Sequence, residues 1–143
     1  MEQSEKSWRQ PFHDNRVVKS RKQEDSMKEN KLVVLSKQFA VDIVNLCTEV
    51  KHGQKAAVLT NQLLRCGTSV GANIHEANYA ASRADFINKL QIALKECYES
   101  DYWLELFRDT KIISEEEFEK FHGSCSKIRT LLIASITTAK KNK

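Results

Sequence analysis

Apolar residues recur at spacings of three and four along four segments of the chain, which is the period of a helix with one buried face. The first two segments run from about Lys31 to Lys51 and from about Ala56 to Ala81. The third opens at Ser82 and the fourth at Ser114, each with an acidic residue three positions later, as in a helix-capping box. Because the connections are short, successive helices are expected to be antiparallel neighbours. The pattern therefore predicts an all-α fold, an antiparallel up-down-up-down four-helix bundle.

Composition supports this fold class and divides the chain into two parts. The 143 residues include four glycines and one proline, too few for the many turns of a β-rich fold. Residues 1–30 are polar and mixed in charge, so we expect a disordered tail there and a bundle domain over residues 31–143. A start at Met27 would give a protein without most of this tail.

Charge and cysteine content indicate the cellular compartment in which the protein is expected. The formal net charge of +4 favours polyanionic partners weakly. No apolar run approaches the roughly 18 residues of a membrane span, and the N-terminus is charged where a signal peptide is apolar. We therefore expect a cytoplasmic protein that has no membrane partner and whose cysteines are thiols. These fall one on each predicted helix, at Cys47, Cys66, Cys97 and Cys125.

The sequence contains only incomplete versions of metal-binding and phosphate-binding motifs. Four thiolates can bind zinc, but without a Cys-x-x-Cys pair we interpret the cysteines as small core residues. The segment from Gly67 to Gly71 lacks the lysine-serine ending of a phosphate-binding loop. Glu119 and His122 supply one Glu-x-x-His motif, where a di-iron bundle needs two. The sequence therefore predicts no enzyme activity, no cofactor and no metal site.

The second and third helices carry more small and apolar residues than one core can cover. Gly67 and Gly71 each cost roughly 1 kcal/mol relative to alanine inside a helix, which favours close packing over accident. The surplus apolar surface of the third helix predicts contacts between subunits of a homo-oligomer. The predicted interface residues are Gly67, Gly71, Ile87, Leu94, Tyr98, Tyr102 and Trp103. The alternative is that the fourth helix or the tail covers the surplus.

Basic residues are the candidates for contacts with nucleic acid. The predicted phosphate-binding residues are Arg65, Arg83, Lys89, Lys95, Lys140 and Lys141. Arg65 and Lys89 can instead pair with Glu76, Glu96 and Glu99 in an ion network that fixes the register of two helices, and a functional polar groove is the alternative. Lys140 and Lys141 also suit the dipole at a helix C-terminus. A symmetric oligomer would repeat every cation around a ring.

Three stretches of the sequence carry a family resemblance. They read QLLRCGTSVGANIHEA, SRADFINKLQIALKECYESDYWLEL and SITTAKKN. Together they resemble the "four-helix bundle protein" family, which includes proteins encoded in intervening sequences of bacterial 23S ribosomal RNA genes, often labelled S23 ribosomal proteins. The resemblance covers about residues 31–143 and leaves residues 1–26 outside, and Cys66 and His75 depart from its pattern.

The resemblance implies a helical bundle that assembles as a homopentamer and has no enzymatic activity. The family is similar to the accessory variability proteins of diversity-generating retroelements, which are pentameric rings that bind nucleic acid and a reverse transcriptase. We therefore predict a non-enzymatic, ring-like homo-oligomer that binds RNA or DNA through basic surface residues. The alternative is a protein–protein adaptor that binds a partner through Tyr98, Tyr102 and Trp103 and whose basic charge is incidental.

Overall fold

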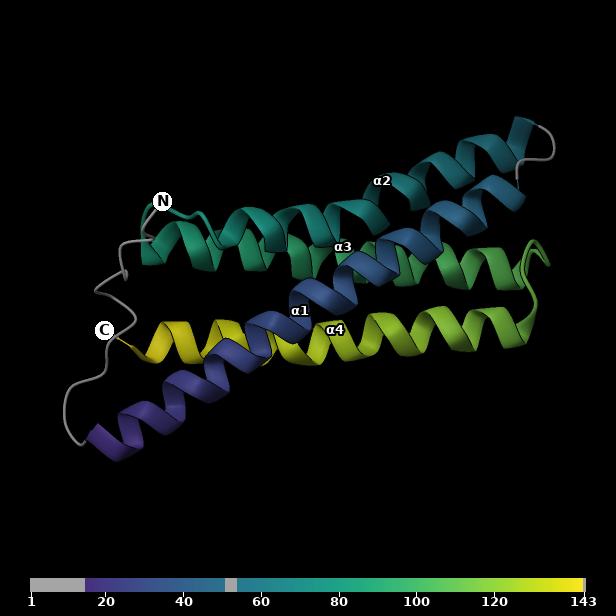
Figure 1. The fold of residues 1–143 in the computed structure, drawn as a ribbon. Coiled ribbons are helices and arrows are strands. Elements are labelled where there is room, and N and C mark those ends of the chain that lie inside the picture. The colour runs from purple at the N-terminus through teal and green to yellow at the C-terminus, as the bar shows by residue number, and fades with distance from the viewer. Residues whose placement is uncertain (1–14, 51–53, 143) are drawn as a thin grey trace.

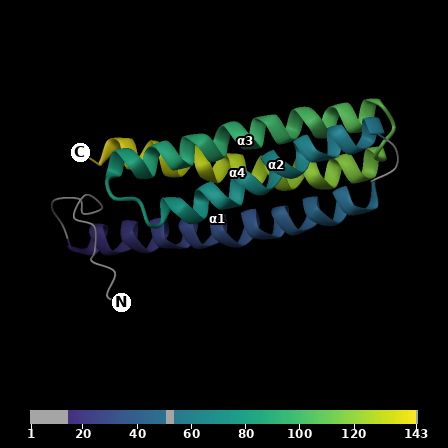
Figure 2. The ribbon, with the colours of Figure 1, turned by 90° about the horizontal axis from the view of Figure 1, so that it is seen from above.

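The computed structural model describes residues 15–50 and 54–142, and these are all-helical, as predicted. Helix α1 spans Asn15–Glu49, α2 spans Gln54–Ala77, α3 spans Arg83–Asp109 and α4 spans Glu115–Lys141. Helices α1 and α3 lie on opposite sides of the molecule, and each packs against both α2 and α4 (Figures 1 and 2). Within the described ranges, no helix combines the length and the apolar character needed to cross a membrane.

The core between the helices is built from the apolar residues that recur at spacings of three and four. The residues predicted to face inward on α3 and α4 are all buried, and they are Phe86, Leu90, Ala93, Cys97, Leu104, Phe107, Phe118, Phe121, Cys125, Ile128, Leu132 and Ile136. Phe39 and Phe107 are the phenylalanines that the core encloses fully. Leu35, Leu59 and Asn73 are half-buried at the margin of the core. The pattern of apolar residues does not reveal four buried polar residues, which are Ser36, Thr60, Ser100 and Asp101.

Helix α1 begins at Asn15 rather than near Lys31, which corrects the predicted start of the first helix. The chain has no glycine or proline between Pro11 and Gly53, and its straight-chain residues have high helix propensity. Once residues 31–49 form a packed helix, adding turns at its N-terminus avoids a new nucleation cost. The described side chains between residues 19 and 30 are all exposed, so this extension forms without a core of its own. Residues 1–14, and Gly53 just after the predicted end of the first helix, lie outside the described residues.

The helix ends follow the predicted capping chemistry with one difference. At Ser114 both bonds of the capping box form, because its side chain accepts from Glu117 N and the Glu117 carboxylate accepts from Ser114 N. At Ser82 the side chain accepts from Asp85 N, but the shorter Asp85 carboxylate accepts from Ala81 N, at 3.3 Å. Helix α2 ends at Ala77, four residues before the predicted end, in a turn that includes a bond from Tyr79 N to the Glu76 carbonyl.

The two glycines of α2 pack against α1 of the same chain. A Cβ added to Gly67 would lie 3.0 Å from side-chain atoms of Ile43, and one added to Gly71 would lie 3.2 Å from the Ser36 carbonyl oxygen. Close packing is therefore the reason for both glycines. The close neighbour on that side of α2 is α1 of the same chain, and a contact between subunits at these glycines stays a prediction.

Candidate nucleic-acid interface

Two of the six predicted phosphate-binding residues are engaged in ion pairs between α2 and α3. Arg65 donates to Glu99 at 2.5 Å and to Glu96 at 3.4 Å. Lys89 Nζ lies 2.8 Å from Glu76 Oε2. The hydrogen bond from Arg65 lowers the pKa of Glu99, whereas burial outweighs the same guanidinium at Glu96 and raises the pKa of that carboxyl. This arrangement supports the interpretation of a register-fixing network over that of a functional groove.

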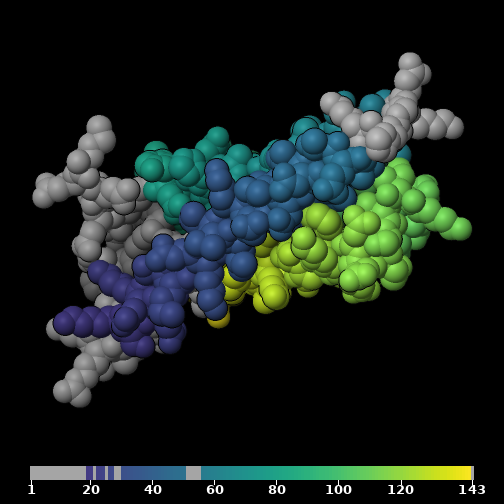
Figure 3. Space-filling view, turned by 45° about the vertical axis from the view of Figure 1, so that its right-hand side comes forward, coloured from purple at the N-terminus to yellow at the C-terminus, as the bar shows by residue number. Residues whose placement is uncertain are grey.

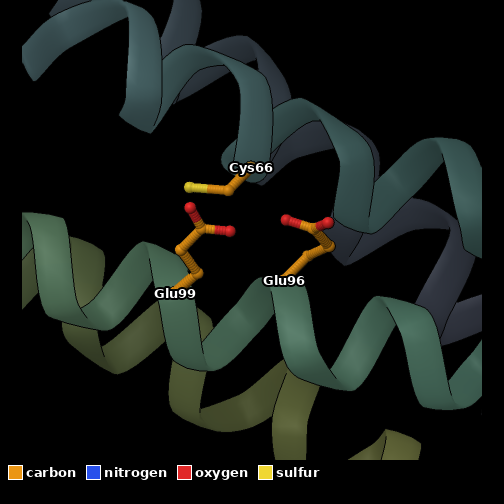
Figure 4. Close-up of side chains that lie close together, drawn as sticks. All are labelled: Cys66, Glu96 and Glu99. Carbon is orange, nitrogen blue, oxygen red and sulfur yellow. The ribbon is translucent and has the colours of Figure 1, made fainter.

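A possible metal-binding group lies inside the same network. Figure 4 shows Cys66 of α2 facing Glu96 and Glu99 of α3, and their ligand atoms lie within 4.8 Å of one another. Burial raises the pKa of the Cys66 thiol to about 11, which disfavours the thiolate that a metal requires. Arg65 already pairs with both carboxylates, so the cluster is explained as an internal ion network.

The other four predicted cations have no such partners. Lys95, Lys140 and Lys141 are exposed and Arg83 is half-exposed, and no described carboxylate lies within ion-pair distance of any of them. The start of α3 and the end of α4 lie at the same end of the molecule, together with the start of α1 (Figure 1). We call this region the basic end, which comprises Arg83, Lys140 and Lys141.

The opposite end of the molecule is acidic. Five exposed carboxylates surround the connection between α3 and α4, at Glu105, Asp109, Glu115, Glu116 and Glu119. By contrast, residues 121–142 contain no aspartate or glutamate. Along α4 charge is therefore separated, and such a separation orients an approaching polyanion toward the C-terminal end of that helix.

The remaining predicted interface residues divide into two groups. Ile87, Leu94 and Trp103 are half-buried against the core, so neighbouring helices cover much of the surplus apolar surface, as the alternative expected. Tyr98 and Tyr102 remain 52% and 58% exposed. These two tyrosines are therefore the members of the predicted interface that a partner can reach most easily.

Two features of the structure were missed from the sequence. Four valines on the outward side of α1 are exposed, namely Val33, Val34, Val41 and Val44, and Figure 3 shows how α1 crosses that face of the molecule. Buried Asp101 of α3 accepts from Arg129 of α4 and lies 3.1 Å from His122 Nδ1. In the sequence, the only indication of a buried carboxylate was that Asp101 follows Ser100 on the inward side of α3. Periodicity alone does not identify the partner of such a carboxylate.

Comparisons with known proteins agree with the resemblance. A model of the family described as 23S rRNA-intervening sequence protein matches residues 28–134. Among solved structures, the chain is similar to a protein of unknown function from the S23 ribosomal protein family of Bacteroides thetaiotaomicron. The two are 50% identical with a TM-score of 0.74, and the match covers 77% of this chain and 98% of that one. Among curated proteins, no match was found. The chain therefore belongs to the 23S rRNA-intervening sequence protein family.

Proposed function

We propose that this chain is a non-enzymatic nucleic-acid-binding accessory protein that contacts phosphates through exposed basic residues. The proposal includes an antiparallel up-down-up-down bundle that assembles as a ring-like homo-oligomer, a pentamer by its resemblance to the accessory variability proteins. A reverse transcriptase or another protein is a further partner in this proposal.

The separation of charge along α4 is the observation that carries the proposal. Lys140 and Lys141 end α4 in a stretch without carboxylates, and Arg83 lies at the same end. When an unpaired surface cation binds a phosphate, counterions are released from the nucleic acid, which favours binding. Arg65 and Lys89 would first have to leave their glutamate partners. The expected phosphate contacts are therefore Lys95, Lys140, Lys141 and Arg83, with Arg65 and Lys89 contributing less.

The test is the binding of a short mixed-sequence RNA to the full chain, followed by fluorescence anisotropy at increasing salt. Each phosphate contact should add about −0.7 to the slope of log K against log salt for a single strand. The double variant K140E/K141E should bind at least about tenfold more weakly at low salt and with a shallower slope. Light scattering after size exclusion should give five times the mass of one chain.

The matched control reverses two exposed lysines near the acidic end, in the variant K111E/K120E. It makes the same change in net charge at a place where the proposal expects no phosphate. Equal losses for the two double variants would show a diffuse charge effect and contradict the assigned surface. Absence of salt-sensitive binding to any nucleic acid would contradict the proposed function.

The adaptor hypothesis is the second candidate, and the exposed valines of α1 favour it. Val34 and Val41, seven residues apart, lie exposed on one side of α1, which fits a protein partner or a second copy of the chain, and neither residue can bind phosphate. An adaptor would show protein binding that the variant V34D/V41D abolishes, together with no response to RNA at low salt.

A further inference from the structure

The outward side of α3 carries a continuous row of exposed residues. Spacings of three, four, three and four residues place this row on one face of the helix. We call it the outer row, which comprises Asn88, Gln91, Lys95, Tyr98 and Tyr102, all exposed. The row thus presents two amides, one ammonium group and two phenol rings.

The rings of Tyr98 and Tyr102 each contact a half-buried side chain. The guanidinium of Arg129, itself paired with buried Asp101, lies 5.2 Å from the centroid of the Tyr98 ring. The ring of Tyr102 meets that of Trp103 edge to face at 5.1 Å, and Trp103 Nε1 donates to Glu99 at 3.3 Å. Because their neighbours are fixed in this way, both rings lose less conformational freedom on binding than free surface side chains would.

The spacing of the rings distinguishes between forms of nucleic acid. Residues four apart on a helix are separated by about 6 Å along its axis. Stacked bases in one strand of a duplex are separated by about 3.4 Å, and their faces are already covered by their neighbours. Only a strand whose bases can spread apart can place two successive bases on Tyr98 and Tyr102.

The charged neighbours of the row indicate where the backbone of such a strand would lie. Lys95 precedes the two rings, and beyond it α3 leads back to Arg83 at the basic end. Past Tyr102 the same face continues with Glu105 and Asp109, which repel phosphate. A subunit contact fits this row less well, because it would bury Lys95, and lysine is depleted from the centres of protein interfaces.

From these observations, and resting on the proposed function, we infer that the outer row is a stacking platform for single-stranded nucleic acid. Tyr98 and Tyr102 stack on two successive unpaired bases, and Lys95 contacts a neighbouring phosphate. The amides of Asn88 and Gln91 are within the same row and can accept or donate to base edges. The preferred ligand is therefore a single strand of RNA or DNA, bound with little dependence on sequence.

The test compares binding of labelled oligo(dT), oligo(U) and a duplex of matched charge to the full chain and its variants. Wild type should prefer both single strands, and Y98L/Y102L should weaken oligo(dT) binding at least about tenfold while leaving the duplex unchanged. The variant Y98F/Y102F keeps both rings and should bind as wild type does. Tyr79→Leu, at another exposed tyrosine outside the row, is the matched control and should have no effect.

Three outcomes would overturn the inference. Equal affinity for single strands and duplex, with no effect of Y98L/Y102L, would leave the proposed function intact and remove the platform. A change of oligomer mass in Y98L/Y102L, measured by light scattering, would assign the tyrosines to a subunit contact. Failure of wild type to bind any of the three probes would remove the proposed function itself and the platform with it.

Discussion

Helix α2 holds its two neighbours by different means. Toward α1 it presents Gly67 and Gly71, and the α1 atoms they face are so close that an added Cβ would lie 3.0 to 3.2 Å from them. Toward α3 it presents Arg65 and Glu76, which reach across to charged partners at the edge of the interface. The close approach of α1 requires that Gly67 and Gly71 have no Cβ, whereas the contacts of Arg65 and Glu76 with α3 are ion pairs.

The two kinds of contact should differ in their tolerance of change. A close backbone approach cannot adjust by rotating a side chain, so each added atom causes strain. An exposed ion pair gives little net free energy, because its charges are well solvated when apart. We therefore expect substitutions at the two glycines to cost more stability than substitutions in the ion pairs, which contribute mainly to register.

Gly71→Leu should have the largest effect of the substitutions on α2. The added side chain would start 3.2 Å from the Ser36 carbonyl oxygen, a backbone atom that cannot rotate away. We expect a loss of about 3 kcal/mol in the free energy of unfolding, at the upper end of the range for overpacking. Urea denaturation followed by circular dichroism measures this loss.

Gly123→Leu is the matched control for that variant, because nothing lies within 4 Å of a Cβ built at Gly123 in α4. Removing a helical glycine there should leave stability unchanged or raise it by up to about 1 kcal/mol. Equal stability of Gly71→Leu and wild type would refute the claim that α1 and α2 are in close backbone contact.

The next largest expected effect is a pH-dependent loss of stability caused by the buried Cys66 thiol of α2. Burial raises its pKa from an ordinary value of 9.0 to about 11. Because the folded state holds this proton more tightly, the stabilisation is complete below pH 9 and is lost as pH rises toward 11. Between pH 8 and about pH 10.5 wild type should lose about 2 kcal/mol more than Cys66→Ala.

Urea denaturation of the reduced proteins at both pH values measures this difference. The variant corrects for tyrosines and lysines that titrate in the same range, since it retains them all. Burial, together with the nearby Cys66, raises the pKa of Cys47 to about 11, so Cys47→Ala should remove a second part of the alkaline loss that is coupled to the first. Identical alkaline slopes in wild type and both variants would contradict the protonated, buried state of these thiols.

The sequence was sufficient to predict buried positions and close packing on α2, but not which helix packs there. Inner residues such as Phe86 and Phe118 were found because burial repeats with the helical period, and the Gly67 and Gly71 pair correctly indicated close packing. The sequence could not assign the packing partner of the glycines, because a small residue accommodates any close neighbour equally well. We predicted another subunit, and the close neighbour is α1 of the same chain.

Charged residues were harder to interpret for a related reason. A lysine has the same sequence pattern whether it faces water, a carboxylate or a phosphate, so Lys89 and Lys95 were predicted together. The structure separates them, because Lys89 lies beside Glu76 whereas Lys95 points away from the core without a described acidic partner. The helical extension over residues 15–30 was missed because apolar periodicity finds packed helices, and this part of α1 packs little.

The smallest expected effect is on the α3 side of α2, and double-mutant cycles measure it. The cycle of Arg65→Met with Glu99→Gln should give a coupling of about 0.5 to 1 kcal/mol, because the Arg65 side chain is 52% exposed. The cycle of Lys89→Met with Glu76→Gln should give a smaller coupling, since the Glu76 side chain is 57% exposed. Both couplings should decrease in high salt.

The pH dependence of the Arg65 coupling provides an independent check of its origin. The pKa of Glu99 is lowered in the folded state, so the stabilisation is present above the ordinary carboxyl pKa and is lost as the pH falls through the lowered value. Glu96 has a raised pKa and opposes this trend, which is a further reason to expect a small net effect. A salt-independent coupling well above 1 kcal/mol would show that charge holds α2 to α3 as firmly as close packing holds it to α1, and the contrast between the two sides would then be wrong.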